Sequence, residues 1–185
     1  WQDEQRQWCA RVLLLRSLED PQYWPDVSES QLLATLDHWL GPYLDNVNSL
    51  QDLKKLDLGA ILAAMLPWEQ QQRLNELAPL RIRVPSGSKL KIDYRETPPV
   101  LAVKLQEMFG CTETPTIVNG KVELMLHLLS PAGRPLQITR DLAGFWNSTY
   151  HDVKKDMKGR YPKHPWPDDP LQALPTHRSK KQSRV

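Results

Sequence analysis

The chain has 185 residues, a formal net charge of +2 and 25% charged side chains, which suits one domain or two small ones with a real core. We find no apolar run near the ~18 residues of a membrane span and no signal-peptide pattern, so no membrane partner is expected. Cys9 and Cys111 lie far apart without CxxC spacing, which disfavours a disulfide or zinc framework and favours a cytoplasmic location.

The charge is unevenly distributed along the chain. Residues 1–78 contain 6 Lys/Arg and 12 Asp/Glu, a net charge of −6, whereas residues 79–185 contain 18 and 10, a net charge of +8. This asymmetry predicts an acidic module beside a basic one, and the basic one is the candidate nucleic-acid surface. Because the chain begins with Trp1 and not Met, we expect it to be a piece of a longer polypeptide.

Residues 1–78 are predicted to form an acidic, all-helical module with a structural role. Apolar residues at helical spacing predict a helix over 2–18. A capping box at Ser28-x-x-Gln31 begins a second helix, which Gly41-Pro42 stops. Two further helices are predicted over about 49–66 and 67–77.

The pattern changes at Pro79 to that of a basic domain, residues 79–170. Alternation of apolar and charged residues predicts a β-hairpin over 80–94, and a second hairpin over 116–124 has an Asn-Gly pair suited to a type I′ turn. Residues 98–109 are predicted to be helical. Short strands are expected over 126–129 and 136–139. The predicted fold is α+β, an antiparallel sheet with helices against one face, or a small barrel.

The last part of the basic domain combines a helix with a stiff arm. Leu142, Phe145, Trp146, Thr149, Val153 and Met157 recur on one face of a helix that should close at a left-handed Gly159. Residues 160–170 follow as a proline-rich arm of bases and aromatics. Residues 171–185 lose periodicity and end in a basic run, so we predict a disordered tail.

Two segments between Pro131 and Pro170, PAGRPLQ-T-DLA-FW and GRYPKHPWPDDP, resemble the C-terminal signature of bacterial HrpB-type DEAH-box helicases. The part from about Leu80 also fits that family, and residues 1–78 fit it too but carry no diagnostic motif. The resemblance implies a C-terminal accessory portion of an ATP-dependent RNA helicase. ATP and Mg²⁺ would then belong to the parent protein, and the helicase core of the same polypeptide would be a partner. Wider relatives carry an oligonucleotide-binding fold, but the helix predicted here falls after the second strand and not the third.

Catalytic motifs are not found in the sequence. It has no GxxxxGK[ST] loop and no Asp-Glu-Ala-His box with which to hold phosphates or magnesium. Its five histidines are scattered, without metal-ligand spacing, and no nucleophile motif is present. We therefore expect no enzymatic activity and no cofactor in this chain by itself.

The first candidate site is the outward face of the 80–94 hairpin. Its four cations could follow the phosphates of single-stranded RNA: Arg81, Arg83, Lys89 and Lys91. The alternative is a solvated strand face whose charges protect an edge from aggregation.

The second candidate site is the arm. Tyr161, His164 and Trp166 could stack on unpaired bases while Arg160 and Lys163 contact phosphates. Alternatively the arm packs back along its own domain or a neighbouring one, with Trp166 as the anchor. Arg134 and Arg140, which flank a predicted strand, either cap carbonyls or contact phosphate. A role in docking a partner protein or the helicase core, without RNA, is the rival functional hypothesis.

Overall fold

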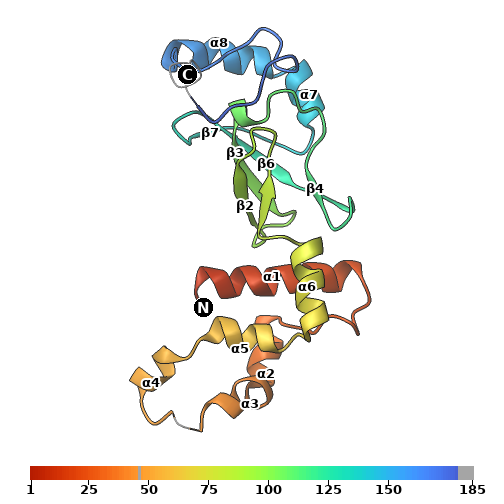
Figure 1. Ribbon diagram of the computed structural model, residues 1–185, viewed down its shortest axis with the longest axis vertical. Coiled ribbons are helices and arrows are strands. Elements are labelled where there is room, and N and C mark those ends of the chain that lie inside the picture. The colour runs from red at the N-terminus through yellow and green to blue at the C-terminus, as the bar shows by residue number, and fades with distance from the viewer. Residues whose placement is uncertain (46, 179–185) are drawn as a thin grey trace. The chain divides into compact units, whose positions relative to one another are not determined.

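The computed structural model describes residues 1–45 and 47–178 (Figure 1). The chain divides into two compact units, 1–78 and 79–185, which are described separately. Residues 179–185 hold most of the predicted basic run, so that part of the disorder prediction lies outside the described residues.

Unit 1 is helical. Its elements in chain order are α1 (Asp3–Leu18), α2 (Glu29–Ala34), α3 (Leu36–Trp39), η1 (Gly41–Tyr43), α4 (Leu50–Lys55), α5 (Leu58–Ala64) and α6 (Trp68–Leu77). Its core contains Val12 and Leu15 of α1, Leu62 of α5, Leu74 of α6 and the fully buried Trp24. The helix predicted over 2–18 is confirmed, although Leu18 at the end of its apolar stripe is exposed.

Two helices predicted in unit 1 are each interrupted. The helix expected over 49–66 divides at Leu56, because Asp57 begins α5 by accepting a hydrogen bond from the Ala60 amide at 3.0 Å. The helix after Ser28 divides at Thr35, whose backbone leaves helical geometry. Leu33 is exposed, and Leu32 is the buried residue of α2.

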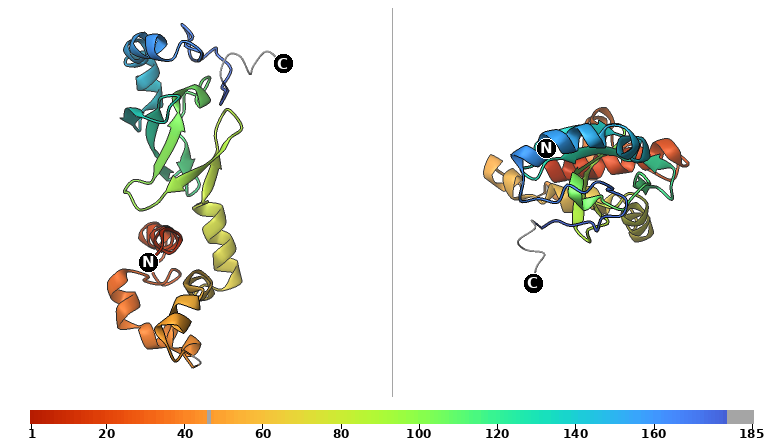
Figure 2. Two further views of the ribbon diagram at one scale, coloured as in Figure 1. Left: turned by 90° about the vertical axis from the view of Figure 1, so that its left-hand side faces the viewer. Right: turned by 90° about the horizontal axis from the view of Figure 1, so that it is seen from above.

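Unit 2 is built on a five-stranded sheet in the order β1-β2-β3-β6-β7, with a separate two-stranded sheet β4-β5 (Figures 1 and 2). The strands are β1 (Arg81–Arg83), β2 (Lys89–Asp93), β3 (Val100–Lys104), β4 (Thr116–Ile117), β5 (Val122–Glu123), β6 (Met125–Leu129) and β7 (Pro135–Thr139). The sheet is mixed and not antiparallel as predicted, because β3 pairs with β6 in parallel. The large sheet is open at β1 and β7, so the described strands close no barrel, and the α+β class is confirmed.

The helix predicted over 98–109 is wrong. Residues 100–104 form the central strand β3, followed by the short 3₁₀ helix η2 (Leu105–Glu107). Val100, Leu101 and Val103 are all buried, and an almost continuous apolar run of this kind suits a strand flanked by neighbours on both sides. Leu105, Met108 and Phe109, which were also assigned to the helix, are buried after the strand.

Both predicted hairpins are confirmed. In the first, Arg81 pairs with Lys91 and Arg83 with Lys89. In the second, Asn119 and Gly120 both have positive φ (53° and 83°), as a type I′ turn requires.

The helix predicted after Arg140 is two helices, α7 (Leu142–Asn147) and α8 (Tyr150–Arg160). Their apolar faces still gather one aromatic cluster, in which Phe145, Trp146 and Tyr150 contact each other edge to face. Gly159 lies within α8 and is not a left-handed cap, because the helix continues to Arg160.

Candidate nucleic-acid interface

The hairpin of β1 and β2 places its four cations on one face of the sheet. Arg81 lies opposite Lys91 and Arg83 opposite Lys89, and all four side chains are exposed. Directly opposed like charges on neighbouring strands repel each other. A polyanion lying along this face would relieve that repulsion.

Three of these four cations are not neutralised by acids of the described part of the chain. Within residues 1–45 and 47–178, Arg81, Arg83 and Lys89 form no ion pair, and the guanidinium of Arg81 donates to the Lys89 carbonyl at 3.3 Å. Lys91 lies beside two carboxylates, Asp93 and Glu96, at the border of a surface hollow. The hairpin face is therefore positive at its β1 edge and mixed where it meets β3.

The two arginines that flank β7 differ in their surroundings. Arg140 Nη2 lies 3.2 Å from the Glu123 carboxylate, so its charge is partly neutralised, and its side chain donates to no carbonyl among the residues that the structure describes. Arg134 is exposed and has no ion-pair partner among the described residues. It lines a hollow of about 260 Å³ together with Arg160 and Tyr161, so three of the predicted site residues do lie near one another.

The arm packs back on unit 2. Trp166 is buried and its indole nitrogen donates to the Tyr161 carbonyl at 2.9 Å, so its ring is not available to stack on a base. His164 Nδ1 lies 3.0 Å from Gln106 Oε1, and burial next to Lys104 lowers its pKa. Lys163 and Arg160 are exposed, and Tyr161 is half-buried.

Three further contacts hold the arm. The Tyr150 hydroxyl donates to the Pro167 carbonyl at 2.9 Å, and the Gly110 amide donates to the Pro170 carbonyl at 3.0 Å. Lys154 forms an ion pair with Asp168, and this hydrogen bond lowers the pKa of that carboxyl. These contacts support the alternative in which the arm packs along its own domain.

The helix η2 brings the hairpin turn and the arm together. Ser86 in the turn donates its amide to the Glu107 carbonyl at 3.2 Å and its hydroxyl to the Glu107 carboxylate at 2.7 Å. Gln106 contacts His164 of the arm, and its carbonyl accepts from the Thr176 amide at 3.0 Å. The described part of the predicted disordered tail, residues 171–178, is thus held against the domain.

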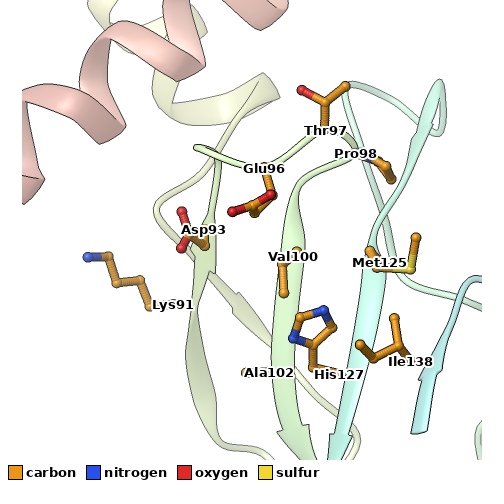
Figure 3. Close-up of a pocket in the computed structure, with 10 residues that line it drawn as sticks. All are labelled: Lys91, Asp93, Glu96, Thr97, Pro98, Val100, Ala102, Met125, His127 and Ile138. Carbon is orange, nitrogen blue, oxygen red and sulfur yellow. The ribbon is translucent and has the colours of Figure 1, made fainter.

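Sequence reasoning missed a hollow of about 470 Å³ on the same sheet face as the hairpin cations (Figure 3). Its residues come from β2, β3, β6 and β7 and the loop before β3: Lys91, Asp93, Glu96, Thr97, Pro98, Val100, Ala102, Met125, His127 and Ile138. The hollow was hidden because β3 was predicted to be a helix. The signal that could have revealed it is the apolar run over residues 100–103, which suits a buried strand as well as a helix.

Residues 39–170 match the family model described as "ATP-dependent helicase C-terminal". The chain belongs to this helicase C-terminal family. The resemblance to HrpB-type helicases is thereby confirmed.

Among the relatives, the chain is 50% identical over 184 residues to the "ATP-dependent RNA helicase HrpB" of Escherichia coli (strain K12), covering 99% of this chain and 23% of that protein. It is similar to the crystal structure of the E. coli DExH-box NTPase HrpB, with a TM-score of 0.87 and 50% identity over 97% of this chain and 22% of that one. A crystal structure of the E. coli DEAH/RHA helicase HrpB matches with a TM-score of 0.72 and 48% identity, covering 90% and 21%.

The helicase C-terminal chain therefore spans less than a quarter of the length of these relatives. Across residues 1–45 and 47–178, no three His, Cys, Asp or Glu side chains gather in a way that could hold a metal ion. In the same ranges, every helix is too short or too polar to cross a membrane.

Proposed function

We propose that this helicase C-terminal chain binds single-stranded RNA along the cationic face of the β1-β2 hairpin. In this role it would extend the nucleic-acid channel of an ATP-dependent RNA helicase. ATP hydrolysis, with its Mg²⁺, would be carried by the helicase core of the same polypeptide. The observation that supports this best is the set of cross-strand cation pairs, because Arg81, Arg83 and Lys89 are exposed and form no ion pair in the described ranges.

A solvated edge that resists aggregation needs only a few charges, and opposed like charges make the hairpin less stable. The arrangement of four cations on a short ribbon is better explained by a polyanionic ligand. Phosphate contacts of this kind carry affinity without sequence information, which suits a motor that moves along many RNA sequences.

The experiment is RNA binding across a salt series. The 185-residue chain should bind a labelled single-stranded RNA with a log–log salt slope near −3, from four phosphate contacts at ~0.7 each. Replacing Arg81, Arg83, Lys89 and Lys91 by Ala should flatten this slope towards zero.

A matched control is Lys121→Ala. Lys121 is exposed in the β4-β5 turn, away from the five-stranded sheet, and its loss removes one positive charge. Lys89→Ala alone should make the slope less steep by ~0.7, whereas Lys121→Ala should leave the slope unchanged. If the fourfold variant binds RNA with the slope of the parent chain, the hairpin has no part in RNA binding.

A second candidate function is docking onto a protein, and unit 1 has features that favour it. Leu33 and Leu50 are 61% and 77% exposed and Trp68 is 71% exposed, and α4 contains no buried residue. Large apolar side chains exposed in this number suit contact with another protein surface, with the helicase core as the proposed partner. In a pull-down, the chain should then retain the helicase core at high salt and after nuclease treatment. The Leu50→Ser variant should retain less of the core.

A further inference from the structure

The open face of the five-stranded sheet carries a row of side chains that leads away from the hairpin cations. Cα pairing places Asp93 beside Val100 and Val100 beside Met125. The next row places Ala102 beside His127 and His127 beside Ile138. These side chains alternate with fully buried ones such as Leu101 and Leu126, so they point to the other, open face.

Along this row the hollow of about 470 Å³ adjoins the cationic hairpin, because Lys91 belongs to both. Its volume lies within the ~300–1,000 Å³ typical of sites for small organic groups. Figure 3 shows the imidazole of His127 among Val100, Ala102 and Ile138, so one wall is a flat ring and the floor is apolar. Ile138 is 54% exposed and lines the hollow beside His127, so its apolar surface is available to a ligand.

We propose that this hollow binds one unpaired base of the RNA strand whose phosphates lie on the hairpin, and this inference rests on the proposed function. The base would stack on His127 and lie against Met125 and Ile138, as bases do on aromatic side chains of single-strand binders. The sugar–phosphate backbone would leave the hollow past Lys91 towards Arg81 and Lys89. Carboxylates at the hollow keep phosphates out of it, so a base, and not a phosphate, is the group that fits.

The acidic side of the hollow gives it a preference between bases. Asp93 is engaged by Arg95, whose Nε lies 2.9 Å from Asp93 Oδ1. Glu96 is exposed and forms no ion pair or side-chain hydrogen bond within the described ranges. A carboxylate can accept a hydrogen bond from the N4 amine of cytosine. Uracil, like thymine, presents the O4 acceptor at the same place, and this acceptor cannot bond to a carboxylate. The hollow should therefore prefer cytosine to uracil.

The test compares labelled oligocytidylate and oligouridylate of about ten nucleotides, a length within the ~4–16 that one binding domain occupies. By fluorescence anisotropy, the 185-residue chain should bind oligocytidylate at least about fivefold more tightly, the lower end for one base-edge contact. Glu96→Gln should bring the two affinities close together, because an amide can also donate to O4. His127→Ala should weaken both ligands by about fivefold or more, through lost stacking.

The control for His127→Ala is His38→Ala. His38 is an exposed histidine of α3, so its loss should change the affinity for neither oligonucleotide. Glu96 is exposed, so Glu96→Gln tests the hollow even if His127→Ala fails to fold. Equal affinities for both ligands, with the hairpin salt slope intact, would overturn the base site and leave the proposed function standing. Absence of RNA binding would overturn both. RNA binding that is insensitive to both Glu96→Gln and His127→Ala would also refute the inference.

Discussion

The buried Arg11 provides a quantitative test of how unit 1 is held together. Arg11 is 3% exposed, and its guanidinium reaches the end of α6. Nε donates to the Ala78 carbonyl at 2.6 Å, and Nη2 donates to the Leu74 carbonyl at 3.2 Å and to Asn75 Oδ1 at 2.7 Å. A cation in this place also suits the negative end of the helix dipole. Arg11→Met keeps the apolar stem and removes all of these bonds.

The expected loss is a substantial fraction of the stability of the unit. Arg11→Met removes the donor to the buried Ala78 carbonyl, whereas the Leu74 carbonyl keeps its bond from the Ala78 amide and Asn75 is exposed to water. A buried acceptor left without a partner costs ~1–3 kcal/mol. Unit 1 comprises residues 1–78, for which ~0.05–0.15 kcal/mol per residue gives a total of ~4–12 kcal/mol. Arg11→Met should therefore lower the free energy of unfolding of unit 1 by ~1–3 kcal/mol.

The measurement is urea unfolding followed by far-ultraviolet circular dichroism, which reports mainly on the helices. Arg6→Met is the matched control, since Arg6 lies on the same helix and is exposed. It should change the free energy of unfolding by no more than ~0.5 kcal/mol. The reasoning is refuted if Arg11→Met costs less than ~1 kcal/mol, or if both variants lose the same amount.

Three further predictions concern unit 2. Trp166→Ala should lower the free energy of unfolding of unit 2 by ~3–5 kcal/mol, measured by calorimetry. The same variant should leave the salt slope of RNA binding unchanged, measured by fluorescence anisotropy. Burial and the charge of Lys104 lower the pKa of His164, so the imidazole is protonated more readily in the unfolded chain than in the folded one. The contribution of His164 to the stability of unit 2 is therefore fully present above pH ~6.5 and falls as the pH drops below that value. His164→Gln should reduce this pH-dependent fall, measured as the urea midpoint at each pH. Asp141→Ala should cost ~0.5–2 kcal/mol by removing the acceptor of the Gly144 amide (2.8 Å), and Asp141→Asn should restore most of it in thermal unfolding.

Local patterns predicted the elements whose partners are close in sequence. The alternation around Arg81 and Lys91 predicted the first hairpin, because two strands joined by a short turn need no distant partner. Asn119 and Gly120 likewise specify their own turn through positive φ. The central strand β3 was missed, because its run of four apolar residues suits a buried strand or a helix, and its neighbour β6 is a distant segment.

The candidate site likewise has features that local sequence predicts and features that depend on distant contacts. Exposure of the hairpin cations followed from the pleat, since a strand sends alternate side chains to opposite faces. The burial of Trp166 depends on contacts between the arm and segments far away, so the sequence left stacking and packing as alternatives. The hollow joins Lys91, His127 and Ile138 from strands whose order is not visible in the sequence.

The parallel pairing of β3 with β6 has a consequence for how unit 2 folds. Val100 meets Met125 only after the intervening chain, with η2 and the β4-β5 hairpin, has crossed over. An isolated hairpin such as β1-β2 forms in ~1–10 μs, whereas pairing of segments distant in sequence is slowed by the entropy of closing the loop. Substitutions that weaken β3 against β6 should therefore slow the assembly of the sheet and prolong the exposure of its apolar centre, where a nascent chain is most prone to aggregate.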